Sequence, residues 1–328
     1  MSSVRSTLGN LAALTGLLIS TFALSACSEA PEAPVIIGTN IWPGYEPGYL
    51  AEQRKLYGEA DVSLRQFRSA TEALRAFRNQ SIDVAAVTLD EALMLAHSGI
   101  ALQLILVTDI SNGGDAIMAR PDIASVKGLA GKRVGVENSA LGDYVLGRAM
   151  QLNGLDDAEF QQITLTADET VELYRRKEIV AVVTFEPFKS RLAALGAKKI
   201  FDSTEIPNEI VDVLVVRSEF AKANPNALKA VVAGWIAATE LINRRDPAAL
   251  AQVAKRLELS TDELRTVLQQ LKLPSLAENR TLLTASTGPL AEAGRKMVPM
   301  LEQRNRIHLE TNPADLLTSA FLPEAEAQ

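Results

Sequence analysis

Side chains able to hold a small polar molecule stand directly after several strand-like runs of the chain. Trp42 and Tyr45 follow the apolar run at residues 35–39, and their rings could stack on a planar or cationic ligand. Asp109 follows a second run, and Glu186 ends a third. In open α/β sheets, ligands bind beyond the carboxyl ends of the strands. We therefore expect these four side chains to meet in one ligand cleft.

Hydroxyl groups at the predicted helix starts add to this site. Ser69 and Thr88 each precede a glutamate by three residues, which is the spacing of a capping box, and Ser139 begins a later helix. The free N–H groups at a helix start can also bond the oxygens of a ligand. The predicted ligand-binding residues are Trp42, Tyr45, Ser69, Thr88, Asp109, Asn112, Ser139 and Glu186.

The predicted site is acidic. Lys189 and Arg191 lie inside a predicted helix, so Arg68 is the only candidate cation beside a site residue. A pocket for a dianion such as sulfate would require more positive charge or many N–H donors. We therefore expect a ligand that is cationic, zwitterionic or neutral with donor groups, such as an amine, an amide or an aminopyrimidine. The alternative is structural: Asp109 caps a turn, and Glu186 complements the positive end of a helix.

No group of residues predicts catalysis or a bound metal. His97 and His308 are the only histidines, and neither follows a predicted strand. The Gly-x-Ser-x-Gly turn of a serine hydrolase is missing, and the segment 126–133 has Val126 where a phosphate loop has its first glycine and Arg133 where it has Ser/Thr. Asp109 and Asp115 could be an acid/base pair, but acidic loop residues are usually turn formers. We expect no enzyme activity, no cofactor and no metal.

The elements that would position the site alternate along the chain. Strand-like runs at residues 35–39, 62–67, 82–87 and 102–108 are separated by helix-like patterns, which predicts βαβ units and a parallel sheet. The same rhythm restarts at Arg133 and indicates a second, smaller α/β lobe. A further strand is predicted at residues 210–216, and the tail after it is predicted to be helical throughout.

The first 27 residues have the pattern of a lipoprotein signal peptide. Arg5 precedes an uncharged, Leu/Ala-rich stretch that ends in the sequence LSAC at residues 24–27, which resembles a bacterial lipobox. The alternative is an uncleaved membrane anchor, but the stretch is only borderline in length for a bilayer. We expect a signal peptide over residues 1–26, a lipid on Cys27 and a flexible linker over residues 27–34.

Composition restricts the class of protein and its partners. Cys27 is the only cysteine, so this exported chain would bury its core without a disulfide, as about 300 residues can do. The chain has 33 basic and 40 acidic residues and a formal net charge of −7. Because no dense basic run occurs, nucleic acid is not an expected partner.

Five local sequences stand in the order expected of one family. They are GTNIWPGY at 38–45, IDVAAVTLDE at 82–91, DISNGGD at 109–115, VKGLAGKRVGV at 126–136 and TFEPF at 184–188. In these the chain resembles the nitrate/sulfonate/taurine-type substrate-binding proteins of ABC transporters, a family that includes thiamine-precursor binders. The resemblance implies an α/β, type II periplasmic-binding-protein fold with two lobes around a ligand cleft. Lobe one would comprise residues 35–113 and 213–328, with the helical tail packed on it, and lobe two residues 114–212.

The resemblance also implies a function and partners. A monomeric lipoprotein in the periplasm or at the cell surface would capture a small polar molecule and deliver it to an ABC permease and its ATPase. A sulfonate-like ligand remains an alternative to the amines and amides that the acidic site favours. The same fold could instead serve a receptor for a membrane signalling protein, or an enzyme of pyrimidine or thiamine-precursor metabolism.

Overall fold

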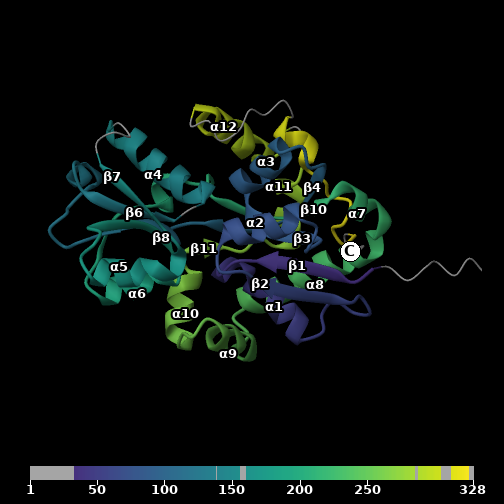
Figure 1. Cartoon of the computed structure of the whole chain (residues 1–328). Helices are drawn as coiled ribbons and strands as arrows, with labels where there is room; N and C mark the ends of the chain where they lie inside the picture. Colours follow the sequence, from purple (N-terminus) through teal and green to yellow (C-terminus); the bar gives the residue numbers. More distant parts are fainter. Residues whose placement is uncertain (1–32, 138, 156–159, 285–286, 304–311, 325–328) are drawn as a thin grey trace, which may run out of the picture. The chain divides into compact units, whose positions relative to one another are not determined.

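The computed structural model contains two mixed β-sheets with helices around them (Figure 1). It describes residues 33–137, 139–155, 160–284, 287–303 and 312–324. The first sheet has the strand order β11-β4-β10-β3-β1-β2, and the second has the order β7-β6-β8-β5-β9. The first consists of β1 (Val35–Thr39), β2 (Val62–Gln66), β3 (Val84–Thr88), β4 (Leu102–Ser111), β10 (Val211–Arg217) and β11 (Leu271–Lys272). The second consists of β5 (Asp115–Ala119), β6 (Arg133–Glu137), β7 (Gln161–Leu165), β8 (Ala181–Phe185) and β9 (Lys198–Asp202).

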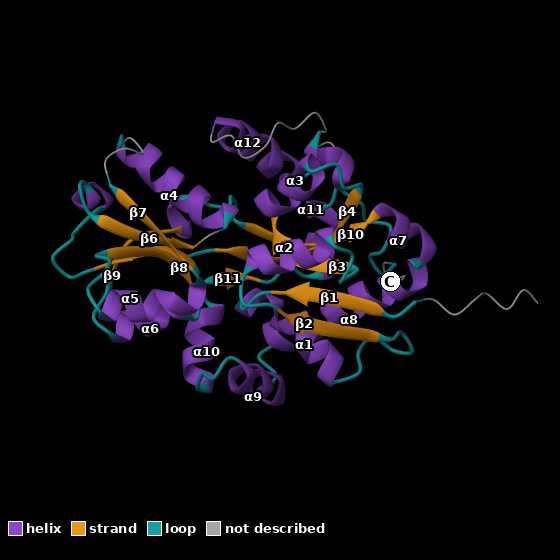
Figure 2. Ribbon diagram, viewed as in Figure 1, coloured by secondary structure: helices purple, strands orange, loops and turns teal. Residues whose placement is uncertain are grey.

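Helices pack on the faces of both sheets. In Figure 2, α4 covers one face of the second sheet, and α5 and α6 cover the other. The helices that follow the first strands are α1 (Glu46–Gln53), α2 (Ala70–Arg78), α3 (Leu89–His97), α4 (Ala140–Asn153), α5 (Thr170–Arg175) and α6 (Phe188–Ala194). The later ones are α7 (Ser218–Ala223), α8 (Pro225–Asn243), α9 (Pro247–Arg256), α10 (Thr261–Leu268), α11 (Leu276–Leu282) and α12 (Pro289–Gln303).

Apolar patterning explains why these segments take these forms. Every residue of β3, β8 and β10 is buried, as expected for strands covered by helices on both faces. Helix α2 buries Leu74 and Phe77, which stand on one face at a spacing of three residues, with its arginines elsewhere. Ser69 caps the start of α2, as its spacing from Glu72 predicts, and Ser260 forms a capping box with Glu263 at the start of α10. The predicted α/β class with a helical C-terminal segment is confirmed.

Two sequence-based expectations about the fold are correct only in part. The predicted parallel βαβ pairings are present in β1, β2 and β3 and in β6, β7 and β8. Neither sheet is parallel throughout, however, because β10 runs antiparallel to β3 and β4, and β5 runs antiparallel to β8 and β9. The tail is also not helical throughout, since it adds the short strand β11 beside β4, and residues 313–316 form only a 3₁₀ turn. Strand direction depends on where the chain crosses between sheets, which local apolar patterns do not reveal.

The chain crosses between the two sheets at residues 112–114 and again between β9 and β10. At the first crossing Gly113 has a φ of 107°, a left-handed conformation that glycine adopts most readily. All strands of the second sheet fall within residues 114–212, whereas the strands of the first lie outside that range apart from the first two residues of β10. The boundaries proposed for the two lobes remain a prediction.

The N-terminal features lie outside the described residues. These features are the signal peptide over residues 1–26, Cys27 and most of the linker; His308 also falls outside. Within the described residues, every helix is too short or too polar to cross a bilayer.

Asn279 of α11 connects the C-terminal segment to the first sheet, and its substitution tests how much this contact stabilises the fold. This fully buried side chain accepts a hydrogen bond from the backbone N–H of Val107 at 2.8 Å and donates one to its carbonyl at 3.1 Å. We expect Asn279→Ala to lower the free energy of unfolding by about 2–3 kcal/mol, because it leaves two buried backbone groups of β4 without a partner. Chemical denaturation measures this value. Thr281→Ala, an exposed change on the same helix, should alter it by about 0.5 kcal/mol or less, and an equal loss in both variants would contradict the assignment.

Candidate ligand-binding site

Residues from both sheets line one hollow. Its lining from the first sheet and the adjoining loops is Asn40, Trp42, Tyr45, Ala70, Thr88, Glu91 and Asp212, and from the second sheet it is Asp115, Glu137, Ser139, Leu141 and Phe185. Most of these positions end a parallel strand or begin the next helix, which is where open α/β sheets bind ligands. A smaller adjoining void shares Asp115, Glu137, Leu141 and Phe185.

Two carboxylates reach this hollow from antiparallel strands. Asp115 begins β5 and is paired with Phe185 at the end of β8, while Asp212, near the start of β10, is paired with Thr88 at the end of β3. In an antiparallel pair, the first residues of one strand lie beside the last residues of its neighbour. The rule that ligand-binding residues follow the carboxyl ends of strands therefore does not identify Asp115 and Asp212, which stand at the starts of antiparallel strands.

Four of the eight predicted ligand-binding residues line the hollow: Trp42, Tyr45, Thr88 and Ser139. A fifth, Asp109, positions the ring of Trp42, because both carboxylate oxygens of Asp109 accept a hydrogen bond from Nε1 of Trp42 at 3.1 Å. The hydroxyl of Tyr45 similarly donates to the carboxylate of Asp212. The two rings are thus fixed by buried carboxylates of the first sheet.

Ser69 and Asn112 are not among the residues that line the hollow. Ser69 accepts a hydrogen bond from the backbone N–H of Glu72 at 3.2 Å, and it is the next residue, Ala70, that faces the hollow. Asn112 is exposed, and its backbone N–H donates to the carbonyl of Gln270 at 2.8 Å. These contacts give both residues a structural role at the rim of the site.

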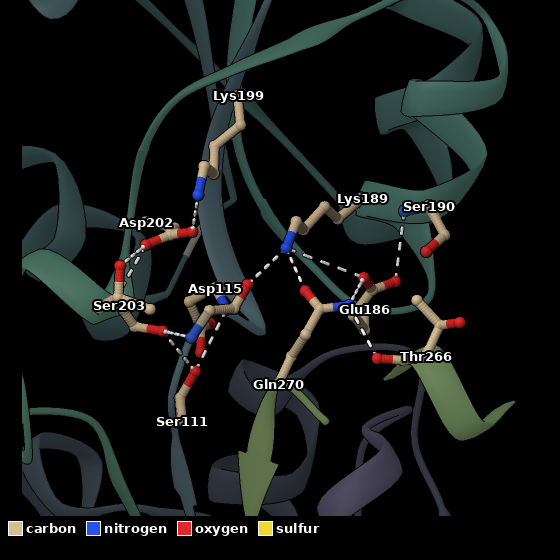
Figure 3. A network of polar contacts seen from close by, with 12 residues as sticks. Ser111, Asp115, Glu186, Lys189, Ser190, Lys199, Asp202, Ser203, Thr266 and Gln270 are labelled. Carbon is tan, nitrogen blue, oxygen red and sulfur yellow. Dashed lines mark hydrogen bonds and ion pairs between the residues drawn. The ribbon is translucent and has the colours of Figure 1, made fainter. Parts of the chain in front are cut away.

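Glu186 is also absent from the lining and belongs to a polar network that, among the described residues, reaches the hollow only at Asp115 (Figure 3). Its carboxylate accepts from Nε2 of Gln270 at 3.0 Å and from the backbone N–H of Ser190 at 3.2 Å, and it lies 4.0 Å from Nζ of Lys189. The ammonium of Lys189 also donates to Gln270 and to the carbonyl of Gly113. Ligand contact by each of the eight residues remains a prediction.

Burial raises the pKa of each carboxyl group that lines the hollow. Loss of hydration raises the pKa of Glu91 to about 8, and neighbouring carboxylates add to this shift. Desolvation likewise raises the pKa of Asp115 to about 7 and that of Glu137 to about 7. The pKa of Asp212 lies well above its ordinary value, first because of burial and then because of nearby negative charge. Buried carboxylates shift in this way when too little positive charge offsets their desolvation.

Few groups in the described part of the protein donate hydrogen bonds to these carboxylates or offset their charge. Among the described residues, neither lysine nor arginine lines the hollow. Within the same residues, Oε1 of Glu91, Oδ2 of Asp115 and Oε1 of Glu137 are buried and have no hydrogen-bond partner. No set of three histidine, cysteine or acidic side chains in the described chain is arranged to hold a metal ion. The site therefore offers unused acceptor atoms and negative charge.

The buried carboxyls should make the stability of the ligand-free protein depend on pH. Their pKa values are raised in the folded state, so between about pH 5 and pH 8 the folded chain holds protons that the unfolded chain has released. Stability should consequently fall as the pH rises through this window, by on the order of 1 kcal/mol or more for each strongly shifted group. Calorimetric melting at several pH values measures the slope. The groups concerned are Asp90, Glu91, Asp109, Asp115, Glu137 and Asp212.

Glu91→Gln provides the matched variant for this measurement. It keeps a side-chain oxygen for the backbone N–H of Thr88, which now donates to Glu91 at 3.2 Å, but it removes the titrating group. We expect a shallower fall of stability with pH in this variant. Glu59→Gln, an exposed change, should retain the wild-type slope. Equal slopes in all three proteins would show that the hollow does not control the pH dependence.

Comparison with known proteins agrees with the fold. The NMT1-like family matches residues 28–258, which is well over half of the chain. The taurine-binding periplasmic protein of Escherichia coli strain K12 is 22% identical over 293 residues, or 84% of this chain and 89% of that protein. The crystallised alkanesulfonate-binding protein of Xanthomonas axonopodis pv. citri, bound to MOPS, has a TM-score of 0.73 at 15% identity, covering 88% of this chain and 99% of that one.

The same fold also occurs in an enzyme. A desulfurization enzyme has a TM-score of 0.66 at 15% identity and covers 88% of this chain and 97% of its own. Likeness at this level shows the fold alone, so the periplasmic-binding-protein fold expected from the sequence is confirmed while the activity is left open. The family match extends over the second sheet and most of the first. This match and the shared fold confirm the expected resemblance, and the chain belongs to the NMT1-like family.

Proposed function

We propose that the chain is the extracytoplasmic solute-binding component of an ABC importer, which captures a small polar molecule and delivers it to a membrane permease and its ATPase. The observation that carries this proposal is the hollow, which is lined from both sheets and contains buried polar atoms without a partner in the described chain. Buried polar atoms are costly when they are left unsatisfied. A bound solute would satisfy them.

The crossing segments provide a hinge for such capture. The hydroxyl of Ser111 lies 2.9 Å from that of Ser203, which also accepts from the backbone N–H of Gly113 at 2.6 Å (Figure 3). Short connectors of this kind permit two sheets to close around a ligand as nearly rigid bodies. In this arrangement the cavity volume is only about 20 Å³, which is room for about one water molecule. An organic ligand therefore enters a wider arrangement, and the walls close on it.

Binding without turnover fits the lining better than catalysis does. Histidine and cysteine are absent from the described residues that line the hollow, and the hydroxyl of Ser139 is engaged with the backbone N–H of Gly142 at 3.1 Å. The taurine- and alkanesulfonate-binding relatives are named as binding proteins, which supports the same conclusion. A receptor that reports its closed form to a membrane signalling protein would use the same binding step.

A thermal-shift screen of small molecules on the chain without its signal peptide tests this function. A specific ligand at a hundredfold excess over its Kd should raise the free energy of unfolding by about 2.7 kcal/mol. Mass spectrometry should then recover that ligand chemically unchanged, at one molecule per chain. Trp42→Ala should reduce the shift, whereas Leu152→Ala, at an exposed position on α4, should leave it intact. Conversion of the ligand into a product would instead establish an enzyme.

We also propose that the mature protein is a monomer tethered by lipid on Cys27 in the periplasm or at the cell surface. Cys27→Ser removes the acceptor for the lipid, so it should move the expressed protein from the detergent phase to the aqueous phase in Triton X-114 partitioning. Mass spectrometry of the N-terminal peptide should show an acyl-modified Cys27 only in the wild type. Equal partitioning of the two proteins and an unmodified peptide would refute the anchor.

A further inference from the structure

We propose that the ligand is a small organic cation with at least two N–H donors, held between Glu91 and Glu137, and that its positive charge favours closure of the two walls. This inference rests on the binding function proposed above and specifies its ligand class. Glu91 lies in the first turn of α3, beside the first sheet, and Glu137 ends β6 of the second sheet. The two carboxylates therefore belong to opposite walls of the hollow.

The unpartnered atoms of the hollow require a ligand that donates hydrogen bonds. Oε1 of Glu91, Oδ2 of Asp115 and Oε1 of Glu137 lack a donor within the described chain, although these residues are only 2%, 2% and 6% exposed. Above about pH 8, where these carboxyls are largely ionised, they only accept hydrogen bonds. The oxygens of a sulfonate also only accept, so they cannot satisfy the ionised groups. Ammonium, guanidinium and protonated aminopyrimidine groups supply both the N–H donors and the charge.

The positive groups nearby are already engaged. Burial raises the pKa of Asp115, and the positive charge of Lys189 opposes that rise. The ammonium group of Lys189, however, already donates hydrogen bonds to Gln270 and to the carbonyl of Gly113, and it is paired with Glu186. Lys189 does not line the hollow. A cationic ligand would thus meet carboxylates that have little competing positive charge, whereas an anionic ligand would add to the uncompensated negative charge.

Three N–H groups near the hollow that could attract an anion have acceptors of their own. At the start of α4, the backbone N–H of Gly142 donates to Ser139 at 3.1 Å, and at the start of α3, that of Thr88 donates to Glu91 at 3.2 Å. The indole N–H of Trp42 donates to Asp109. These three donors form hydrogen bonds within the protein. The unpaired carboxylate oxygens of the hollow are therefore the groups that select the ligand.

Aromatic rings from both walls add a surface that suits a cation. Trp42 of the first wall meets Phe185 of the second edge to face, with 5.9 Å between ring centroids and an interplanar angle of 78°. Both residues line the hollow beside the carboxylates. Aromatic rings attract cations electrostatically, so rings and carboxylates favour the same ligand charge.

The same charges couple ligand binding to closure. Burial and the charge of Asp90 raise the pKa of Glu91, and the negative charge of Glu137 raises it further, so the two glutamates oppose each other in the closed arrangement. A cation placed between them converts this repulsion into two attractions. Because the ligand then binds the closed form better than the open form, its charge shifts the population toward closure.

Four probes with the same carbon chain test the ligand class: butylamine, diaminobutane, butylguanidinium and butanesulfonate. We expect the cations to raise the melting temperature of the wild type at about pH 8.5, where the lining carboxyls are largely ionised, and butanesulfonate to leave it unchanged. Diaminobutane and butylguanidinium, which carry N–H donors on separate nitrogen atoms, should act more strongly than butylamine, whose donors share one nitrogen. Calcium, magnesium and zinc ions form a further arm, because a metal that binds more tightly than every organic cation would overturn the proposal.

Glu137→Gln provides the charge test at constant shape. Titration calorimetry should show the best cation binding about tenfold or more weakly to this variant, while Glu59→Gln, at an exposed position, retains wild-type affinity. The melting temperature of ligand-free Glu137→Gln should equal or exceed that of the wild type, which establishes that the variant folds. If it does not fold, Asp115→Asn replaces it. Small-angle scattering should show that the cation compacts the wild type.

The outcomes separate the ligand class from the binding function. If butanesulfonate stabilises the protein and the cations do not, the cation inference fails while the binding function stands. The inference also fails if the wider screen yields a ligand without positive charge, or if no cation alters the melting temperature. An equal affinity of wild type and Glu137→Gln for the cation would likewise overturn it. Turnover of a bound cation would leave the ligand class standing and would refute the proposed function.

Discussion

Carboxylates buried without a matching positive charge, where strands of the two sheets end, impose the main constraint on this molecule. Glu91, Asp115, Glu137 and Asp212 line one hollow, and burial raises the pKa of each. An arrangement of this kind reduces the stability of the free protein above neutral pH and is offset by a ligand that supplies positive charge and donors. The proposed ligand and the proposed closure would act on the same few charges that set the pH dependence of folding.

The relatives and the site point to different ligand charges. Taurine- and alkanesulfonate-binding proteins share the fold, and the fold itself is indifferent to the charge of the solute, because the strand ends and helix starts can carry either acceptors or donors. In this chain, the helix-start donors of Gly142 and Thr88 are satisfied internally and the carboxylate acceptors are not. Side-chain identity at a few lining positions thus determines what a shared scaffold can hold.

Polar contacts join the two crossing segments to each other and to the C-terminal segment. Ser111 and Ser203 join the two crossings by hydrogen bonds, and Gln270 of the C-terminal segment connects Asn112 and Glu186 across them. Polar contacts of this type exchange readily when segments move, in contrast to an apolar core. Glu186, which the motif pattern suggested as a ligand contact, belongs to this network and not to the lining of the hollow.

The sequence by itself determined the elements that follow from local rules. The apolar run at residues 35–39, the helix cap at Ser69 and the aromatic residues after the first strand were all predictable, because strand patterning, helix capping and the strand-end rule act over a few residues. Only the tertiary structure decided the strand directions, and with them the positions of Asp115 and Asp212 in the hollow. The reason is that antiparallel pairing brings together residues distant in the chain, and burial without counter-charge is a property of that assembled neighbourhood.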